Sequence, residues 1–299
     1  MDAPIESVMT LKHHSNADEL KEFMNKYDKN PFFHPFWHAI KFTLEGVFPT
    51  IELSLYSYEM GTFELLIAYN KNKLTDDYIM LFCDGELNGE HFKRAMAEFF
   101  RLRPLDKRIV VVGEERIANM LSTYITENAS PFRIVLYPCR MFYMNESQME
   151  AVRELKVPEL PHGYELGSAD PDKDAEIITK TWRHARANEM PQTKAKLTNL
   201  PSSCVRYEGE PVGFEMMDAA GLLNHLFVLE EHRRKGLGTI IELDLAKKII
   251  NNGCKVYKCV ELYNKSVLTG SERSPYWSSI KDDAGNDVLV VFAVVYKEE

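Results

Sequence analysis

The spacing of apolar residues predicts a mixed α/β fold in the first half of the chain. Ile51, Leu53 and Leu55 alternate with polar residues, which is the pattern of a half-buried strand. The segment 63–69 follows a turn that contains glycine, so it predicts the second strand of a hairpin. The segment 89–102 predicts a helix with one apolar face. That face consists of Phe92, Met96, Phe99 and Phe100.

A segment rich in proline divides the pattern in two. Residues 154–163 contain two prolines and a glycine, which predicts a linker rather than a helix or strand. We therefore expect an N-terminal α/β domain over residues 1–150 and a second domain over residues 160–299.

The second half predicts a mixed, mostly antiparallel sheet flanked by helices. Apolar residues recur at Ala175, Ile178, Trp182 and Ala185, which is the spacing of a helix. The segment 203–217 predicts two strands around a Glu-Gly-Glu-Pro turn. The remaining expected elements are a strand over 222–229, a helix over 236–253, a strand over 255–262 and a closing hairpin over 277–296.

Composition limits the classes of partner. The chain has 299 residues and a formal net charge of −9, and its isoelectric point is near 5.6. An acidic chain argues against a broad nucleic-acid or anionic-membrane surface, although a local basic site for a small anion stays possible. Five cysteines without a Cys-x-x-Cys pair indicate neither a disulfide framework nor a zinc site. His34 and His38 lie four residues apart but lack further ligands nearby, so we expect no metal.

The same features bear on location. No run approaches the roughly 18 apolar residues of a membrane helix. The first twenty residues have neither a hydrophobic signal core nor the arginine-rich character of a transit peptide. We expect an intracellular monomer with no membrane or nucleic-acid partner, although a mitochondrial address is not excluded.

The clearest chemical signal is a glycine-rich segment where a strand gives way to a helix. Arg233, Gly236 and Gly238 form the pattern Arg-x-x-Gly-x-Gly immediately before the apolar helix. The first N–H groups of a helix have no partner within it and attract anions, and glycine allows a ligand to approach the backbone closely. Arg234 and Lys235 add positive charge. The segment predicts a phosphate or pyrophosphate site, and it matches neither a P-loop nor a Rossmann fingerprint.

This pattern resembles the pyrophosphate loop of the GNAT acyltransferase superfamily. The stretch around it is similar to the glycine N-acyltransferase family in particular, over about residues 160–265. The matching features are Pro201 with Cys204, the turn 208–212, Met217-Asp218 with Gly221, and the run 229–237. The first half resembles that family only diffusely, as a degenerate GNAT-like half.

The resemblance implies an acyl-CoA-dependent N-acyltransferase that acts on the amino group of glycine or another small amine or amino acid. Acyl-CoA would be the co-substrate, and a mitochondrial location would follow from the family, with the cytoplasm as the alternative. The resemblance implies that Leu226, Phe227 and Val228 pair with the pantetheine amides, and that Asn264 contacts CoA or the acceptor. It also implies that the loop binds the pyrophosphate, through Arg233, Arg234, Lys235, Gly236, Leu237, Gly238 and Thr239.

One position departs from the family. Its general base is a glutamate eleven residues before the motif arginine, and that position here is Leu222. Asn224 lies on the same strand face and could position a water, whereas His225 would need a strand bulge to reach that face. Tyr276 is a candidate proton donor to a leaving thiolate. The nearby carboxylates are Asp218, Glu215 and Glu261.

The leucine also leaves a second function open. A non-catalytic acyl-CoA-binding or regulatory protein on the same fold would keep the loop and lose the base.

Overall fold

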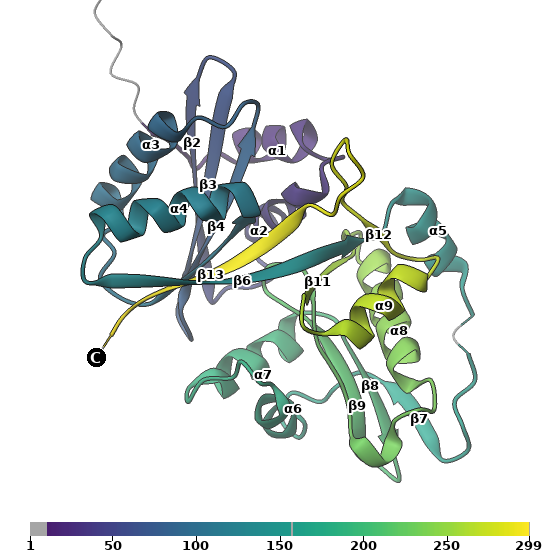
Figure 1. The fold of residues 1–299 in the computed structure, drawn as a ribbon. Coiled ribbons are helices and arrows are strands. Elements are labelled where there is room, and N and C mark those ends of the chain that lie inside the picture. Colours follow the sequence, from purple (N-terminus) through teal and green to yellow (C-terminus); the bar gives the residue numbers. More distant parts are fainter. Residues whose placement is uncertain (1–10, 157, 299) are drawn as a thin grey trace, which may run out of the picture.

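The computed structural model describes residues 11–156 and 158–298, so the predicted absence of a targeting signal falls largely on residues 1–10, outside the described part. Within that part the strands form two sheets (Figure 1). The larger sheet has the order β1-β2-β3-β4-β5-β13-β6-β11, with β12 paired to β6, and only β4 and β5 run parallel. Its strands are β1 (Lys12–His14), β2 (Ile51–Met60), β3 (Phe63–Asn72), β4 (Asp77–Asp84), β5 (Ile109–Glu114), β6 (Phe132–Tyr143), β11 (Tyr257–Glu261), β12 (Ser278–Ser279) and β13 (Leu289–Lys297).

The smaller sheet is antiparallel and has the order β10-β9-β8-β7. Its strands are β7 (Tyr164–Gly167), β8 (Ser202–Tyr207), β9 (Glu210–Met217) and β10 (Leu223–Val228). The predicted Glu-Gly-Glu-Pro turn joins β8 to β9, where Glu208 and Gly209 both have positive φ. The expectation of a mixed, mostly antiparallel fold is confirmed.

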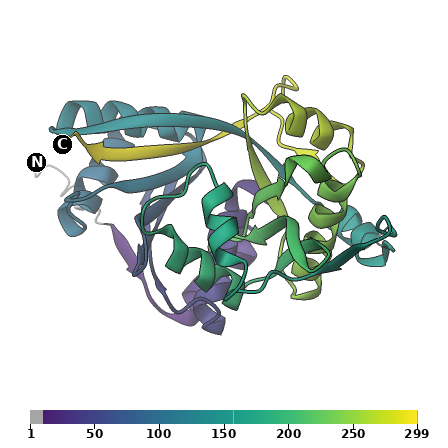
Figure 2. The ribbon, with the colours of Figure 1, turned by 90° about the horizontal axis from the view of Figure 1, so that it is seen from below.

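Helices cover both faces of the larger sheet. On one face α3 (Gly89–Leu102) and α4 (Glu115–Asn128) bury the predicted apolar face, including Phe92, Met96 and Phe99. On the other face lie α1 (Ala17–Lys26), the short turn η1 (Pro31–Phe33) and α2 (His34–Glu45). This arrangement leaves the second face of β5, β13 and β6 turned toward the smaller sheet (Figures 1 and 2).

The smaller sheet also lies between helices. One face packs on α8 (Leu237–Asn251), which is joined to β10 through η2 (Glu230–His232), and the other packs on α6 (Ala175–Thr181) and α7 (Glu189–Asn199). Two further helices, α5 (Glu146–Glu154) and α9 (Lys265–Arg273), lie near α8 (Figure 1). In Figure 2, α6 and α7 stand between the two sheets.

The helix predicted across Ala175 to Ala185 is broken, which corrects that expectation. Helix α6 ends at Thr181, and Trp182 has extended backbone angles. The Lys196 ammonium, on α7, lies 4.9 Å from the centre of the Trp182 ring. Packing of the Trp182 ring on α7 therefore replaces the continuation of the helix.

The predicted closing hairpin is only partly correct. The turn forms around Asp282 and Gly285, and Lys281 bridges to Asp287. Beyond it the two arms separate, because β12 pairs with β6 whereas β13 inserts between β5 and β6. The larger sheet therefore contains strands from both sides of the predicted linker, and the division into 1–150 and 160–299 stays a prediction.

Candidate functional site

The first backbone N–H groups of helix α8 donate to no capping side chain among the described residues. Its N-cap is Gly236, which has φ +77° and offers no side chain to the first turn. The first turn contains no acidic residue, so its partial positive charge is not neutralised from within the helix. This end of α8 is therefore suited to hold an anion.

Gly236 and Gly238 are suited to this loop for different physical reasons. Gly236 needs its positive φ, which side chains rarely adopt. Gly238 has no such angle, and a Cβ built there would meet only Leu226 Cδ2, at 4.0 Å. Neither backbone strain nor crowding requires glycine at 238, so the open space above it fits a group that approaches the backbone.

The basic side chains around the loop are partly engaged. Arg233 Nε donates to the carbonyl oxygen of Val228 at 2.8 Å, and its guanidinium lies over the Phe227 ring. Lys235 Nζ donates to Tyr164 Oη at 2.8 Å. Arg234 has φ +60° and an exposed side chain. Arg233 and Lys235 thus shape the loop, and the exposed Arg234 is placed to attract an anion from solution.

A split between two strands leads inward from this loop. Strand β10 is the end strand of the smaller sheet, and β11 is the end strand of the larger one. End strands present N–H and C=O groups along one side that no neighbouring strand satisfies. The predicted pantetheine-binding residues Leu226, Phe227 and Val228 lie on β10 at this split. An extended ligand with amide groups would find bonding partners there.

A bulge interrupts β10 between Asn224 and Phe227. Within it His225 adopts φ +62°, and its ring lies near Phe214 and Phe227 on the face that α6 covers. The bulge that the sequence argument required for His225 to share the face of Asn224 is thus present.

The bulge also ties His225 to α6. Its Nε2 lies 3.1 Å from Thr181 Oγ1, and its ring also bonds the backbone of Ile178. Burial lowers the pKa of His225 to about 4. The His225 ring is therefore neutral near pH 7, and its contacts hold α6 against the bulge. Its catalytic role stays a prediction.

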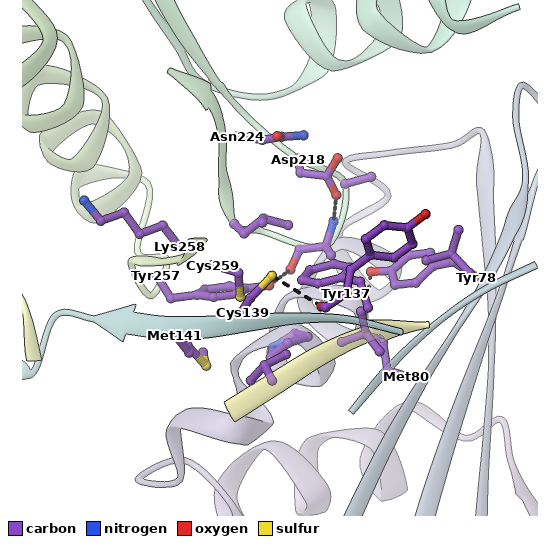
Figure 3. Close-up of a pocket in the computed structure, with 18 of the residues that line it drawn as sticks. Tyr78, Met80, Tyr137, Cys139, Met141, Asp218, Asn224, Tyr257, Lys258 and Cys259 are labelled. Carbon is purple, nitrogen blue, oxygen red and sulfur yellow. Dashed lines mark hydrogen bonds between the residues drawn. The ribbon is translucent and has the colours of Figure 1, made fainter. Parts of the chain in front are cut away.

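The split opens into a cavity of about 770 Å³ between the two sheets (Figure 3). Leu222, directly before β10, and Asn224, on β10, line it on one side, and Tyr257 and Cys259 line it from β11. The opposite wall comes from the larger sheet, through Tyr78, Val112, Tyr137, Cys139, Met141 and Phe292. Leu222, at the family's base position, faces this cavity and packs beside Tyr257.

Asn224 belongs to a buried polar group at the cavity edge (Figure 3). It bonds to Asp218, whose carboxylate also accepts from the Ala220 N–H at 2.9 Å and from Lys196 Nζ at 2.8 Å. Burial raises the pKa of Asp218, but the charge and hydrogen bond of Lys196 outweigh it, so that the pKa lies below its usual range. Asp218 is therefore an ionised anchor for Asn224 and a weak base.

A second buried group lies beneath α8. Glu242 pairs with Lys258 and accepts from Trp277 Nε1 at 3.0 Å. Glu215 lies close by on β9, and its Oε2 has no hydrogen-bond partner among the described residues. Burial and the neighbouring Glu242 raise the pKa of Glu215 well above its usual range. Glu215 is thus the carboxyl near the site that most readily keeps its proton.

The remaining predicted residues lie at different distances from the cavity. Asn264 is the N-cap residue of α9, directly after β11, and lines the cavity. Glu261 also lines it and lies 3.3 Å from His184 Nε2. Tyr276 is absent from the described lining and packs against the core beneath α8 instead. Its predicted role as a proton donor stays a prediction without a contact to support it.

The first half repeats the strand–helix–strand order without repeating the anion site. There α3 lies between β4 and β5, as α8 lies between β10 and β11. The N-cap Asn88 side chain accepts from the N–H groups of Glu90 and His91, and Glu90 adds negative charge to the first turn. The N-terminus of α3 is thus satisfied from within, and the anion-binding features belong to α8.

Over 11–156 and 158–298, no three or more His, Cys, Asp and Glu side chains come together as metal ligands. No helix within the same ranges is long and apolar enough to span a bilayer.

Comparison with known proteins identifies the fold. No family model matches the sequence. A Drosophila protein solved by structural genomics has a TM-score of 0.79 at 14% identity, covering 96% of this chain and 98% of that one. A tandem GNAT protein from the clavulanic acid biosynthesis pathway has a TM-score of 0.53 at 13% identity, covering 97% and 99%. A GCN5-related N-acetyltransferase from Kribbella flavida has a TM-score of 0.51 at 13% identity, covering 85% and 93%.

These similarities confirm the predicted fold class, a GNAT-like mixed α/β fold with two GNAT-like halves. Sequence reasoning found the loop and singled out the strand residues Leu226 to Val228, but it did not predict the split and missed the far wall of the cavity, including Tyr78 and Tyr137. No local motif marks those residues, because they reach the site only through the pairing of β13 with β5 and β6.

Proposed function

We propose that the protein is an acyl-CoA-dependent N-acyltransferase that acts on the amino group of a small amine or amino acid, glycine included. The observation that carries this proposal is the exposed N-terminus of α8, with its unhindered Gly238, at the entrance of the β10–β11 split. The names of two structural neighbours, both GNAT proteins, support the same class of reaction.

The residues divide the work of binding. The N–H groups from Arg234 to Thr239 would hold the CoA pyrophosphate, with Arg233 and Lys235 shaping the loop. The edge of β10 from Leu226 to Val228 would pair with the pantetheine amides, and Asn264 would contact CoA or the acceptor. When bound, CoA supplies the activated acyl group.

The acceptor amine must lose a proton before it attacks, and Leu222 offers no base. Asn224, held by the ionised Asp218, is placed to orient the amine or a water. We infer that solvent takes the proton, so that the rate rises with pH as the free-amine fraction grows. His225 contributes as the anchor of the bulge, because its neutral ring is bonded to α6.

Thiol release tests this function. The purified chain is mixed with acetyl-, benzoyl- or decanoyl-CoA and a panel of amines, and free CoA thiol is followed over time. We expect release that depends on both the acyl-CoA and the amine. Binding of acyl-CoA without release by any amine would favour the alternative, a non-catalytic acyl-CoA-binding protein. No change in melting temperature with millimolar CoA or acyl-CoAs would contradict both.

A further inference from the structure

The far side of the cavity opens through a mouth lined by basic side chains. A second hollow adjoins the cavity there, and the two share Arg108, Tyr137, Arg186 and Val294. The charged side chains around this hollow are four basic and two acidic: Lys107, Arg108, Arg186 and Lys297 against Asp106 and Glu298. Lys107 already pairs with Asp77, so an anionic ligand at this hollow would meet chiefly the guanidiniums of Arg108 and Arg186.

Two guanidiniums at this mouth share one carboxylate. Arg186 Nη1 lies 3.2 Å from Asp76 Oδ2, and Arg108 Nη1 contacts the same oxygen. Each guanidinium carries five N–H donors, so one carboxylate satisfies only a fraction of them. The side chain of Arg186 is 49% exposed, which leaves its remaining donors accessible.

The two neighbouring guanidiniums, those of Arg108 and Arg186, repel each other. Desolvation and the charge of Arg186 lower the pKa of Arg108 below its usual range. A further carboxyl near the arginines, that of Glu189, is buried, and burial raises its pKa. Glu189 also lies 4.0 Å from Lys196, which already pairs with Asp218. A second carboxylate at the arginine pair would relieve the repulsion and use a fork geometry that suits bidentate binding.

The wall between the arginines and Asn224 is apolar and aromatic. It includes Tyr78, Val110, Tyr137, Met141, Phe292 and Val294. Tyr137 is 42% exposed, so part of its ring is open to a ligand. The pantetheine arm would take the part of the cavity beside Leu226, and an acetyl group with glycine is small beside a total of about 770 Å³.

We propose that the acceptor is an amine with an apolar or aromatic body and an anionic group, and that Arg108 and Arg186 bind that group. This inference rests on the proposed function and refines it. It gives the first half of the chain a role, because Arg108 and most of the aromatic wall belong to that half. The first half has no anion site of its own at α3. In this proposal it supplies the cavity wall that selects the acceptor.

Calorimetry on the full chain with CoA present tests the proposal through binding, independently of turnover. 4-(Aminomethyl)benzoate, 4-(aminomethyl)benzamide and glycine are titrated in turn, because the first carries its amine and its carboxylate at opposite ends of an aromatic body. We expect the benzoate to bind at least tenfold more tightly than either of the others. Arg186→Gln should abolish the preference for the acid over the amide. Arg183→Gln is the matched control, because Arg183 lines the same cavity but stacks on Tyr263.

The outcomes separate this proposal from the proposed function. Intact CoA binding with no preference between acid and amide, or a preference unchanged in Arg186→Gln, overturns the acceptor assignment alone. Stepwise tighter binding of longer acyl-CoAs, with no acceptor selectivity, assigns the wall to the acyl chain and also overturns it. Failure of CoA to bind contradicts the proposed function itself.

Discussion

The side chain of Leu226 lies 4.0 Å from the position that a Cβ atom on Gly238 would occupy. Leu226 belongs to the bulged end strand β10, and Gly238 belongs to the first turn of α8. This proximity places the unsatisfied N–H groups of the helix beside the unpaired edge of the strand. A ligand with a phosphate at one end and amides behind it therefore meets both features in sequence.

Leu222 gives a direct test of the missing base. Leu222→Glu places a carboxylate at the cavity wall beside Tyr257. A positioned base contributes about 10²- to 10⁴-fold in favourable cases, and we expect thiol release to rise at least tenfold, measured at saturating acyl-CoA. Apolar surroundings raise the pKa of such a carboxyl, so the gain should grow as pH rises through it.

The control for that substitution is Leu222→Gln, which has nearly the same shape and no basic group. Equal rates in the Glu and Gln variants would show that position 222 does not supply the base.

The Lys196–Asp218 pair is expected to hold the cavity edge. Their side chains are 3% and 19% exposed, and the atoms Nζ and Oδ2 lie 2.8 Å apart. Lys196→Met leaves the carboxylate buried without its partner, and we expect the free energy of unfolding to fall by about 3 kcal/mol at pH 7. Urea denaturation measures this change.

The pH dependence of that loss follows from the Asp218 pKa. In the wild type Lys196 helps to hold it low, so stability from Asp218 is present above the unfolded pKa and is lost as pH falls through the folded pKa. In Lys196→Met the carboxyl pKa rises, and the deficit relative to wild type should shrink at low pH. The double variant Lys196→Met/Asp218→Asn should recover stability at pH 7. A deficit independent of pH and of residue 218 would contradict this explanation.

Because His38 is buried in its neutral form, we expect the free energy of unfolding to fall on mild acidification. His38 is fully buried, and burial lowers its pKa to about 4. The unfolded histidine has a pKa of about 6.5, so the unfolded state binds an extra proton between these values and stability falls as pH drops through that window. At pH 5.5 the contribution of His38 should be about 1.4 kcal/mol smaller than at pH 7.5.

Denaturation of wild type and His38→Leu at both pH values isolates this contribution. The variant should lose less stability on acidification, by about that amount. An identical acid-induced loss in both proteins would show that His38 does not titrate as proposed.

Local pattern predicted much of the second half. The turn at Glu208-Gly209, the loop at Gly236 and helix α8 follow from short-range signals that tertiary packing does not override. The break after Thr181 was not predictable in this way, because the packing of Trp182 on Lys196 depends on α7. Helical spacing continued past the point where the helix ends.

Long-range pairing limited the prediction of the site. Strand β13 follows a turn that predicts a simple hairpin, yet it pairs with β5 and β6, far away in sequence. That insertion brings Arg108, Tyr137 and Phe292 to the cavity. The bulge at His225 was recognised only as a condition, because alternation alone does not reveal where a strand gains a residue.

The central claim is that the N-terminus of α8 binds the pyrophosphate of CoA. A calorimetric titration of CoA tests it most directly, with wild type compared to Gly238→Asp and Gly167→Asp. Position 238 tolerates a side chain without strain, and an acidic residue in the first turn favours the helix, so the unliganded variant should remain folded. Gly167 is equally open and lies at the other end of α8, where Lys248 Nζ donates to its carbonyl oxygen at 3.0 Å. We expect saturable CoA binding by wild type and Gly167→Asp, and binding at least tenfold weaker by folded Gly238→Asp. Equal affinities for all three proteins, or no binding by wild type, would contradict the claim.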